Sequence, residues 1–129
     1  MKTTTLGLAR LLAFGAFVAA LAPATAHALP KVLVCYVDRG LNTQTVATGL
    51  NPNNTFFSGI DFLDCSQNTP SLQTLKGYDG VLLWANGSYL DRTTLGNNLA
   101  DYTDAGGGVV QGMYNFYNQQ GFGFDLQGR

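Results

Sequence analysis

The sequence contains no glutamate, and its one histidine, His27, lies close to the amino terminus. Cysteine occurs twice, and lysine and arginine together number seven in 129 residues. A protein that loses His27 by processing cannot build a Ser-His-Asp relay or a histidine-based zinc site from its own side chains. Aspartates, amides, hydroxyls, tyrosines and the two cysteines are the groups that remain for chemistry.

The first 28 residues have the pattern of a secretory signal peptide. Lys2 and Arg10 precede an apolar run at 11–21, and the Ala-His-Ala at 26–28 has the small-x-small pattern after which signal peptidase cleaves. The apolar run is too short to cross a hydrocarbon core of about 30 Å. The sequence therefore predicts a secreted or periplasmic protein that starts near Leu29 and has no membrane association after cleavage.

The part that follows the predicted cleavage site is weakly acidic. Residues 29–129 keep five lysines and arginines against eight aspartates, which gives a net charge of −3. No basic patch is left to neutralise phosphates, so nucleic acid is not an expected partner. The glycines at 106–108 follow a helical pattern and precede a strand, the reverse of a phosphate-binding loop, so no cofactor is expected either. A small polar ligand or another protein is the expected partner.

Apolar runs that are typical of buried strands alternate with helical patterns. Lys31–Val37 is rich in valine and almost continuously apolar, and Val81–Trp84 are four consecutive large apolar residues. Both patterns indicate strands that are buried on both faces of a parallel sheet. Within the segment 78–87 the second of these runs forms the third strand, and further strands are predicted at 55–65 and 108–113.

Helices are predicted between these strands. Their expected N-terminal caps are Asn42, Thr69 (followed by Pro70) and Asp91. In the last helix Leu95, Leu99 and Tyr102 fall on one stripe, which predicts that this stripe packs against the sheet. Gly106 is placed to end that helix in a left-handed turn.

The alternation of strands and helices predicts one α/β domain at 29–129. We expect three layers, with a mostly parallel sheet of strand order 2-1-3-4 between flanking helices. The sequence stops soon after its fourth strand, where an open doubly wound sheet usually adds a helix and another strand. We therefore expect a domain that is incomplete at its C-terminal edge, or one whose sheet is completed by a partner.

The segment "LKGYDGVLLWANGSYLDRTTLGNNLADYTDAGGGVV", residues 75–110, together with the opening strand "KVLVCYVD", resembles the class I glutamine amidotransferase-like superfamily. That superfamily includes exported and trehalose-utilisation-like proteins. The resemblance covers most of residues 29–129 and implies a flavodoxin-like fold. Its motifs are packing and turn signals, so they carry the fold and no activity.

The resemblance also bears on catalysis. In catalytic relatives the strand after the glycines runs into a Gly-x-Cys turn, whose cysteine is a nucleophile served by a later His and Glu. Here the matching corner is Gly112-Met113-Tyr114, and neither His nor Glu follows it. We expect a non-catalytic binding or structural module. The alternative is a hydrolase or transferase of this superfamily whose catalytic residues lie beyond Arg129.

Polar residues follow several of the predicted strands. In open α/β sheets ligands bind beyond the carboxyl ends of the strands, near the point where the strand order reverses. These residues either form a site for a small polar ligand or are ordinary loop residues that cap helices and satisfy turns. The candidate ligand-binding residues are Asp38, Arg39, Asn86, Ser88, Tyr114 and Asn115.

Asp38 and Asp64 end adjacent predicted strands. Two carboxylates there could act as ligands for Mg²⁺ or Ca²⁺, but paired acids at strand ends also occur as helix-capping anions. No spaced Asp-x-Asp loop supports a metal, so no metal site is predicted.

The two cysteines also leave two readings open. Cys35 lies inside the first strand and Cys65 at the end of the second, so the two would be neighbours in the sheet. An exported protein can oxidise them to a disulfide. A cysteine inside a buried strand, such as Cys35, is also well explained as a small apolar side chain.

Overall fold

The computed structural model describes residues 28–112, 115 and 126–129. The predicted signal sequence up to residue 27 lies outside these residues, as do Met113, at the end of the predicted fourth strand, and Tyr114 of the predicted site. In order along the sequence the elements are β1 (Lys31–Val37), α1 (Thr43–Leu50), a 3-10 turn η1 (Pro52–Asn54), β2 (Gly59–Asp64), α2 (Leu72–Leu75), β3 (Gly80–Ala85), α3 (Arg92–Asp104) and β4 (Gly108–Gln111).

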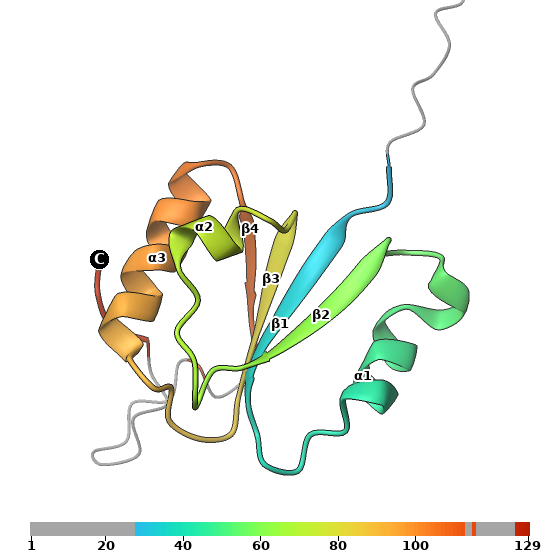
Figure 1. The fold of residues 1–129 in the computed structure, drawn as a ribbon, viewed down its shortest axis with the longest axis horizontal. Helices are drawn as coiled ribbons and strands as arrows, with labels where there is room; N and C mark the ends of the chain where they lie inside the picture. The colour runs from blue at the N-terminus through green and yellow to red at the C-terminus, as the bar shows by residue number, and fades with distance from the viewer. Residues whose placement is uncertain (1–27, 113–114, 116–125) are drawn as a thin grey trace, which may run out of the picture.

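Within these residues, four parallel strands form one sheet in the order β2-β1-β3-β4. Figure 1 shows the sheet between helical layers, with α1 on one side and α2 and α3 on the other. This is the three-layer α/β fold that the sequence predicts, with the same strand order. None of the helices in the described part of the chain has the length and apolar character needed to cross a bilayer.

The main core lies between the sheet and the helices α2 and α3. Alternate residues of β1 and β3 point into it because side chains alternate between the two faces of a strand. The α3 stripe predicted from the sequence is buried against them, with Leu95, Leu99 and Tyr102 all enclosed. The buried apolar residues of this core are Leu33, Cys35, Val37, Cys65, Leu75, Val81, Leu83, Ala85, Tyr89, Leu95, Leu99 and Tyr102.

The opposite face of the sheet is covered much less. Val34 of β1 is buried there, but 42 % of Trp84 in β3 and 64 % of Val110 in β4 are exposed. The helix on this side, α1, buries none of its own residues. The expectation that Val81–Trp84 is buried on both faces is therefore wrong for Trp84, because α1 supplies too thin a cover for this side of the sheet.

The predicted helix caps are confirmed at two of three places. The side chain of Asn42 accepts a hydrogen bond from the Thr45 N–H at the start of α1, and Asp91 does the same for Thr94 in α3. The cap of α2 is Ser71, which bonds the Thr74 N–H, so the expectation for Thr69 is wrong. Gly106 has a φ of +95°, the left-handed turn expected after α3.

The second strand is shorter than predicted. It begins at Gly59 because the Asn51 side chain holds the preceding residues in a loop. The Asn51 amide oxygen accepts hydrogen bonds from the N–H groups of Phe56 and Phe57, at 2.9 and 3.1 Å, and its nitrogen donates to the Phe57 carbonyl at 2.9 Å. These bonds use backbone groups that a longer strand would need for its ladder.

The C-terminal tail, residues 126–129, lies along α3. Leu126 packs against the core, and the Gln127 N–H donates to the Arg92 carbonyl at 3.3 Å. The Arg129 guanidinium forms ion pairs with Asp101 and Asp104. The tail is thereby fixed to the outer side of this helix (Figure 1).

Candidate functional site

A cleft of about 970 Å³ opens at the carboxyl edge of the sheet. It lies where the strand order reverses, since β2 adds to one side of β1 and β3 to the other. This is the position at which open α/β sheets bind ligands. The residues that line the cleft are Val37, Asp38, Arg39, Gly40, Asp64, Ser66, Gln67, Asn86, Gly87 and Ser88.

Asp38 and Arg39 enter the cleft directly after β1. The Asp38 Oδ1 accepts a hydrogen bond from the Gly40 N–H at 2.9 Å, which closes a tight turn. Its Oδ2 accepts from the Trp84 Nε1–H at 3.4 Å. The carboxylate is thus held in one orientation, while the Arg39 side chain is exposed beside it.

Asp64 and Ser66 form the wall that follows β2. One oxygen of Asp64, Oδ1, accepts both the Ser66 N–H at 2.9 Å and the Ser66 hydroxyl at 2.6 Å. Asp64, considered from the sequence as a metal ligand or a helix-capping anion, is not among the predicted ligand-binding residues, and neither are Ser66 and Gln67. Their place in the site could have been predicted, because Ser66 and Gln67 follow a strand that pairs with β1.

Asn86 and Ser88 form the third wall, after β3. The Asn86 N–H donates to the Val37 carbonyl at 2.7 Å, so the backbone continues its pairing with β1 for one residue beyond the strand. The side chains of Asn86 and Ser88 are exposed. The structure thus brings Asp38, Arg39, Asn86 and Ser88, four of the six predicted residues, to the same cleft.

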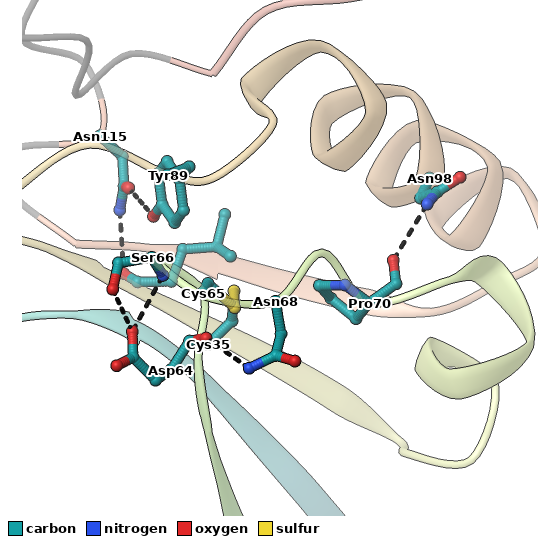
Figure 2. Close-up of a disulfide and its surroundings, with 10 residues drawn as sticks. Cys35, Asp64, Cys65, Ser66, Asn68, Pro70, Tyr89, Asn98 and Asn115 are labelled. Atoms are coloured by element: carbon teal, nitrogen blue, oxygen red, sulfur yellow. Dashed lines mark hydrogen bonds between the residues drawn. A yellow bond between two sulfur atoms is a disulfide. The ribbon is translucent and has the colours of Figure 1, made fainter.

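A disulfide joins Cys35 and Cys65 next to Asp64 and Ser66 of the cleft wall (Figure 2), and both cysteines are fully buried. Of the two readings that the sequence left open, the structure has the bonded pair. Cys65 also links the walls through its backbone, because its N–H donates to the Tyr36 carbonyl at 2.8 Å and its carbonyl accepts from the Leu90 N–H at 2.9 Å. The loop that carries Asp64 and Ser66 is thereby fixed to the central strand.

Asn115 does not line the cleft. It is only 3 % exposed, and its side-chain nitrogen donates to the carbonyls of Leu83 and Gly112 at 2.9 and 3.2 Å. Its oxygen accepts from the Tyr89 hydroxyl (Figure 2). Burial raises the pKa of Tyr89, so this phenol stays a neutral donor. The side-chain amide of Asn115 is thus engaged within the protein, and Tyr114 lies outside the described residues.

The two carboxylates of the cleft serve turns. Oδ1 of Asp38 and Oδ1 of Asp64 each bind N–H groups of their own loops, and neither residue caps a helix. In the described part of the chain, no group of three His, Cys, Asp or Glu side chains lies close enough to hold a metal ion. Asp38, Asp64 and Arg39 together give the cleft a net charge of −1. The lining residues also provide a mixture of hydrogen-bond donors and acceptors that suits a small polar molecule.

Comparisons with known proteins give one structural likeness. No family model and no curated protein matches the sequence. A ThuA-like protein from Bacteroides uniformis ATCC 8492, known from a crystal structure at 2.30 Å resolution, matches with a TM-score of 0.51 and 23 % sequence identity. The match covers 78 % of this chain and 43 % of that one, so this chain spans less than half the length of its structural neighbour. ThuA-like proteins belong to the class I glutamine amidotransferase-like superfamily, and the likeness shows that this chain has the flavodoxin-like fold.

Proposed function

We propose that the protein is an exported, non-catalytic binding domain of the class I glutamine amidotransferase-like superfamily, and that it holds a small polar ligand at the carboxyl edge of its sheet. The cleft between the three strand ends carries this proposal. It has the volume of a small-molecule site and lies at the switch point of the sheet.

The available side-chain chemistry supports binding over catalysis. After the predicted cleavage site the sequence contains neither histidine nor glutamate. In the cleft, the Ser66 hydroxyl meets a carboxylate, but the Ser66 N–H binds the same oxygen two residues away, as in an ordinary turn. In a Ser-His-Asp relay a histidine takes the proton of the serine, and no histidine follows the predicted cleavage site.

The test is a binding screen on the domain of residues 29–129. Protein NMR spectra would be recorded with amino acids, polyols and small organic acids added separately. We expect at least one class to shift the resonances of the cleft, and Arg39→Ala to weaken that binding. Gln73→Ala, on the exposed side of α2, is the matched control and should leave binding unchanged. Equal binding by the Arg39 variant, or shifts confined to another surface, would contradict the proposal.

A hydrolase or transferase of the same superfamily is the second candidate. It is favoured by one observation, that the chain spans 43 % of its structural neighbour. Catalytic residues would then lie beyond Arg129. Sequencing the gene past this codon separates the two candidates, because an enzyme requires further strands that bring a histidine and an acidic residue to this cleft.

Export is part of the proposal and has its own test. The first strand in the described residues, β1, starts at Lys31, three residues after Ala28, which precedes the predicted cleavage site. Expression of the full-length protein in its host should yield a secreted or periplasmic product whose amino-terminal residue is Leu29. An unprocessed product that keeps Met1 in the cytoplasm would refute it.

A further inference from the structure

The dipeptide Asn86-Gly87 forms part of the cleft wall after β3. We propose that Asn86 is a site of spontaneous deamidation in the folded protein, and that its conversion places a third carboxylate in the cleft. Asparagine followed by glycine is the most reactive context for this chemistry, because glycine has no side chain to shield its backbone nitrogen. Here the Asn86 residue is exposed and Gly87 is partly exposed.

The two reacting groups are the Asn86 side-chain amide and the Gly87 nitrogen. The Asn86 side chain is exposed, and within the described residues no hydrogen bond holds its amide. The Gly87 N–H likewise makes no hydrogen bond to any described residue. The attack on the amide therefore breaks no existing hydrogen bond of this turn.

Packing explains why glycine stands at position 87. A Cβ there would lie 3.0 Å from Cγ1 of Val37, which is buried in the core. A larger residue would require the Val37 side chain to shift by a few tenths of an ångström. Packing thus favours glycine at position 87, and this glycine makes the preceding Asn86 reactive.

Other asparagines provide an internal comparison. Asn53 is exposed like Asn86, but it is followed by Asn54, whose side chain shields the backbone nitrogen. Asn115 is buried, and its amide is fully bonded. Among the described asparagines, Asn86 is thus the one that is exposed and also followed by glycine.

The chemistry balances with water as the co-reactant. The Gly87 nitrogen loses its proton and bonds to Cγ of Asn86, and the bond from that Cγ to Nδ2 breaks to release ammonia. Water then opens the resulting five-membered succinimide at one of its two carbonyls. The product is aspartate or, when the backbone passes through the former side chain, isoaspartate.

The consequence for the cleft is a change of charge from −1 to −2. Asp38 and Asp64 already line it, with Arg39 as the one cation among its lining residues. A third carboxylate would weaken binding of anions and strengthen binding of cations. This consequence rests on the proposed function, whereas the modification itself does not.

The experiment incubates the folded domain of residues 29–129 at neutral pH and follows each asparagine by peptide mass spectrometry, with isoaspartyl methyltransferase labelling of the products. We expect conversion at Asn86 to exceed that at Asn53 and at every other described asparagine. Asn86→Gln should abolish the labelled product from this peptide, since glutamine would have to close a larger ring. An Asn86 that stays intact while the urea-unfolded protein deamidates would overturn the proposal, because the fold would then protect the site.

Binding to the cleft is read separately. Asn86→Asp, which reproduces the charge of one product, is compared with the unmodified domain by NMR with the same amino acids, polyols and organic acids. A cleft that binds nothing in either form would count against the proposed function only, since the mass spectra report the modification without any ligand.

Discussion

At the scale of single residues, Gly96 illustrates how the tail determines an unusual choice inside a helix. Glycine in a helix interior costs about 1 kcal/mol relative to alanine. In α3, however, a Cβ at position 96 would lie 1.8 Å from the Gln127 carbonyl oxygen. The absence of a side chain is what lets the C-terminal tail lie against the helix.

Gly96→Ala should therefore destabilise the domain although it improves helix propensity. We expect a loss of about 1–3 kcal/mol, the range for overpacked sites, measured by urea unfolding. Gly49→Ala is the matched control, because Gly49 lies in α1 with nothing within 4 Å of an added Cβ. The control should be neutral or gain up to about 1 kcal/mol. A Gly96 variant as stable as the control would show that the tail does not contribute to stability.

Trp84, the single tryptophan, reports on the thinly covered face of the sheet. Because 42 % of this residue is exposed, its fluorescence in the native domain should be readily quenched by acrylamide. N-acetyl-tryptophanamide in solution provides the fully exposed reference. Quenching as weak as for a buried tryptophan would mean that this face is covered in solution.

At the scale of elements, the start of α3 depends on a carboxylate. Hydrogen bonds from Thr94, the backbone N–H first, hold the pKa of Asp91 below its usual value of 3.8. A carboxyl group whose pKa is lowered on folding stabilises the fold above its unfolded pKa, and that contribution disappears as the pH falls through the folded pKa.

The variant Asp91→Asn removes the charge of the N-cap residue and keeps its hydrogen-bond acceptor. Asparagine keeps an acceptor for the Thr94 N–H but carries no charge. We expect the variant to be less stable than the wild type at about pH 6, and this difference to shrink below pH 3.8, as the pH falls through the lowered pKa of Asp91. Urea unfolding at the two pH values measures it. A difference that stays constant with pH would mean that the Asp91 charge contributes nothing.

Much of the element order could be predicted from local patterns. The bounds of β1 were found to the residue, and Asn42, Asp91 and Gly106 mark helix ends by chemistry that acts within a few residues. The error at Trp84 has a non-local cause. Trp84 looks buried in sequence, but its exposure depends on how much of the sheet α1 covers.

The candidate site likewise contains residues that could be predicted from the sequence and one, Asn115, that could not. Asp38, Arg39, Asn86 and Ser88 could be placed because the carboxyl ends of parallel strands meet at one edge. Asn115 comes after the last strand as well, yet it turns inward to satisfy the Leu83 carbonyl and the Tyr89 hydroxyl. No local signal separates an asparagine that faces a cleft from one that fills a buried polar position.

At the scale of the whole molecule, the disulfide should be a large contributor to stability. It joins residues 30 positions apart, and a constraint of this length on the unfolded state contributes about 3–4 kcal/mol. The double variant Cys35→Ala/Cys65→Ala should lose about that amount in urea unfolding under non-reducing conditions. Wild-type protein with reductant should approach the variant, once unfolding exposes the buried sulfurs. Alkylation of both thiols in denatured, unreduced protein would refute the bond.

The strand order β2-β1-β3-β4 also determines how the sheet can assemble. Of the four strands, β1 is the first to be synthesised, and its two edges receive β2 and then β3 in sequence order. The fourth strand adds outside β3. Each new strand therefore meets a free edge, and none has to enter between two strands that are already paired. A polypeptide that emerges amino terminus first can build this sheet outward from β1 in the order in which its segments appear.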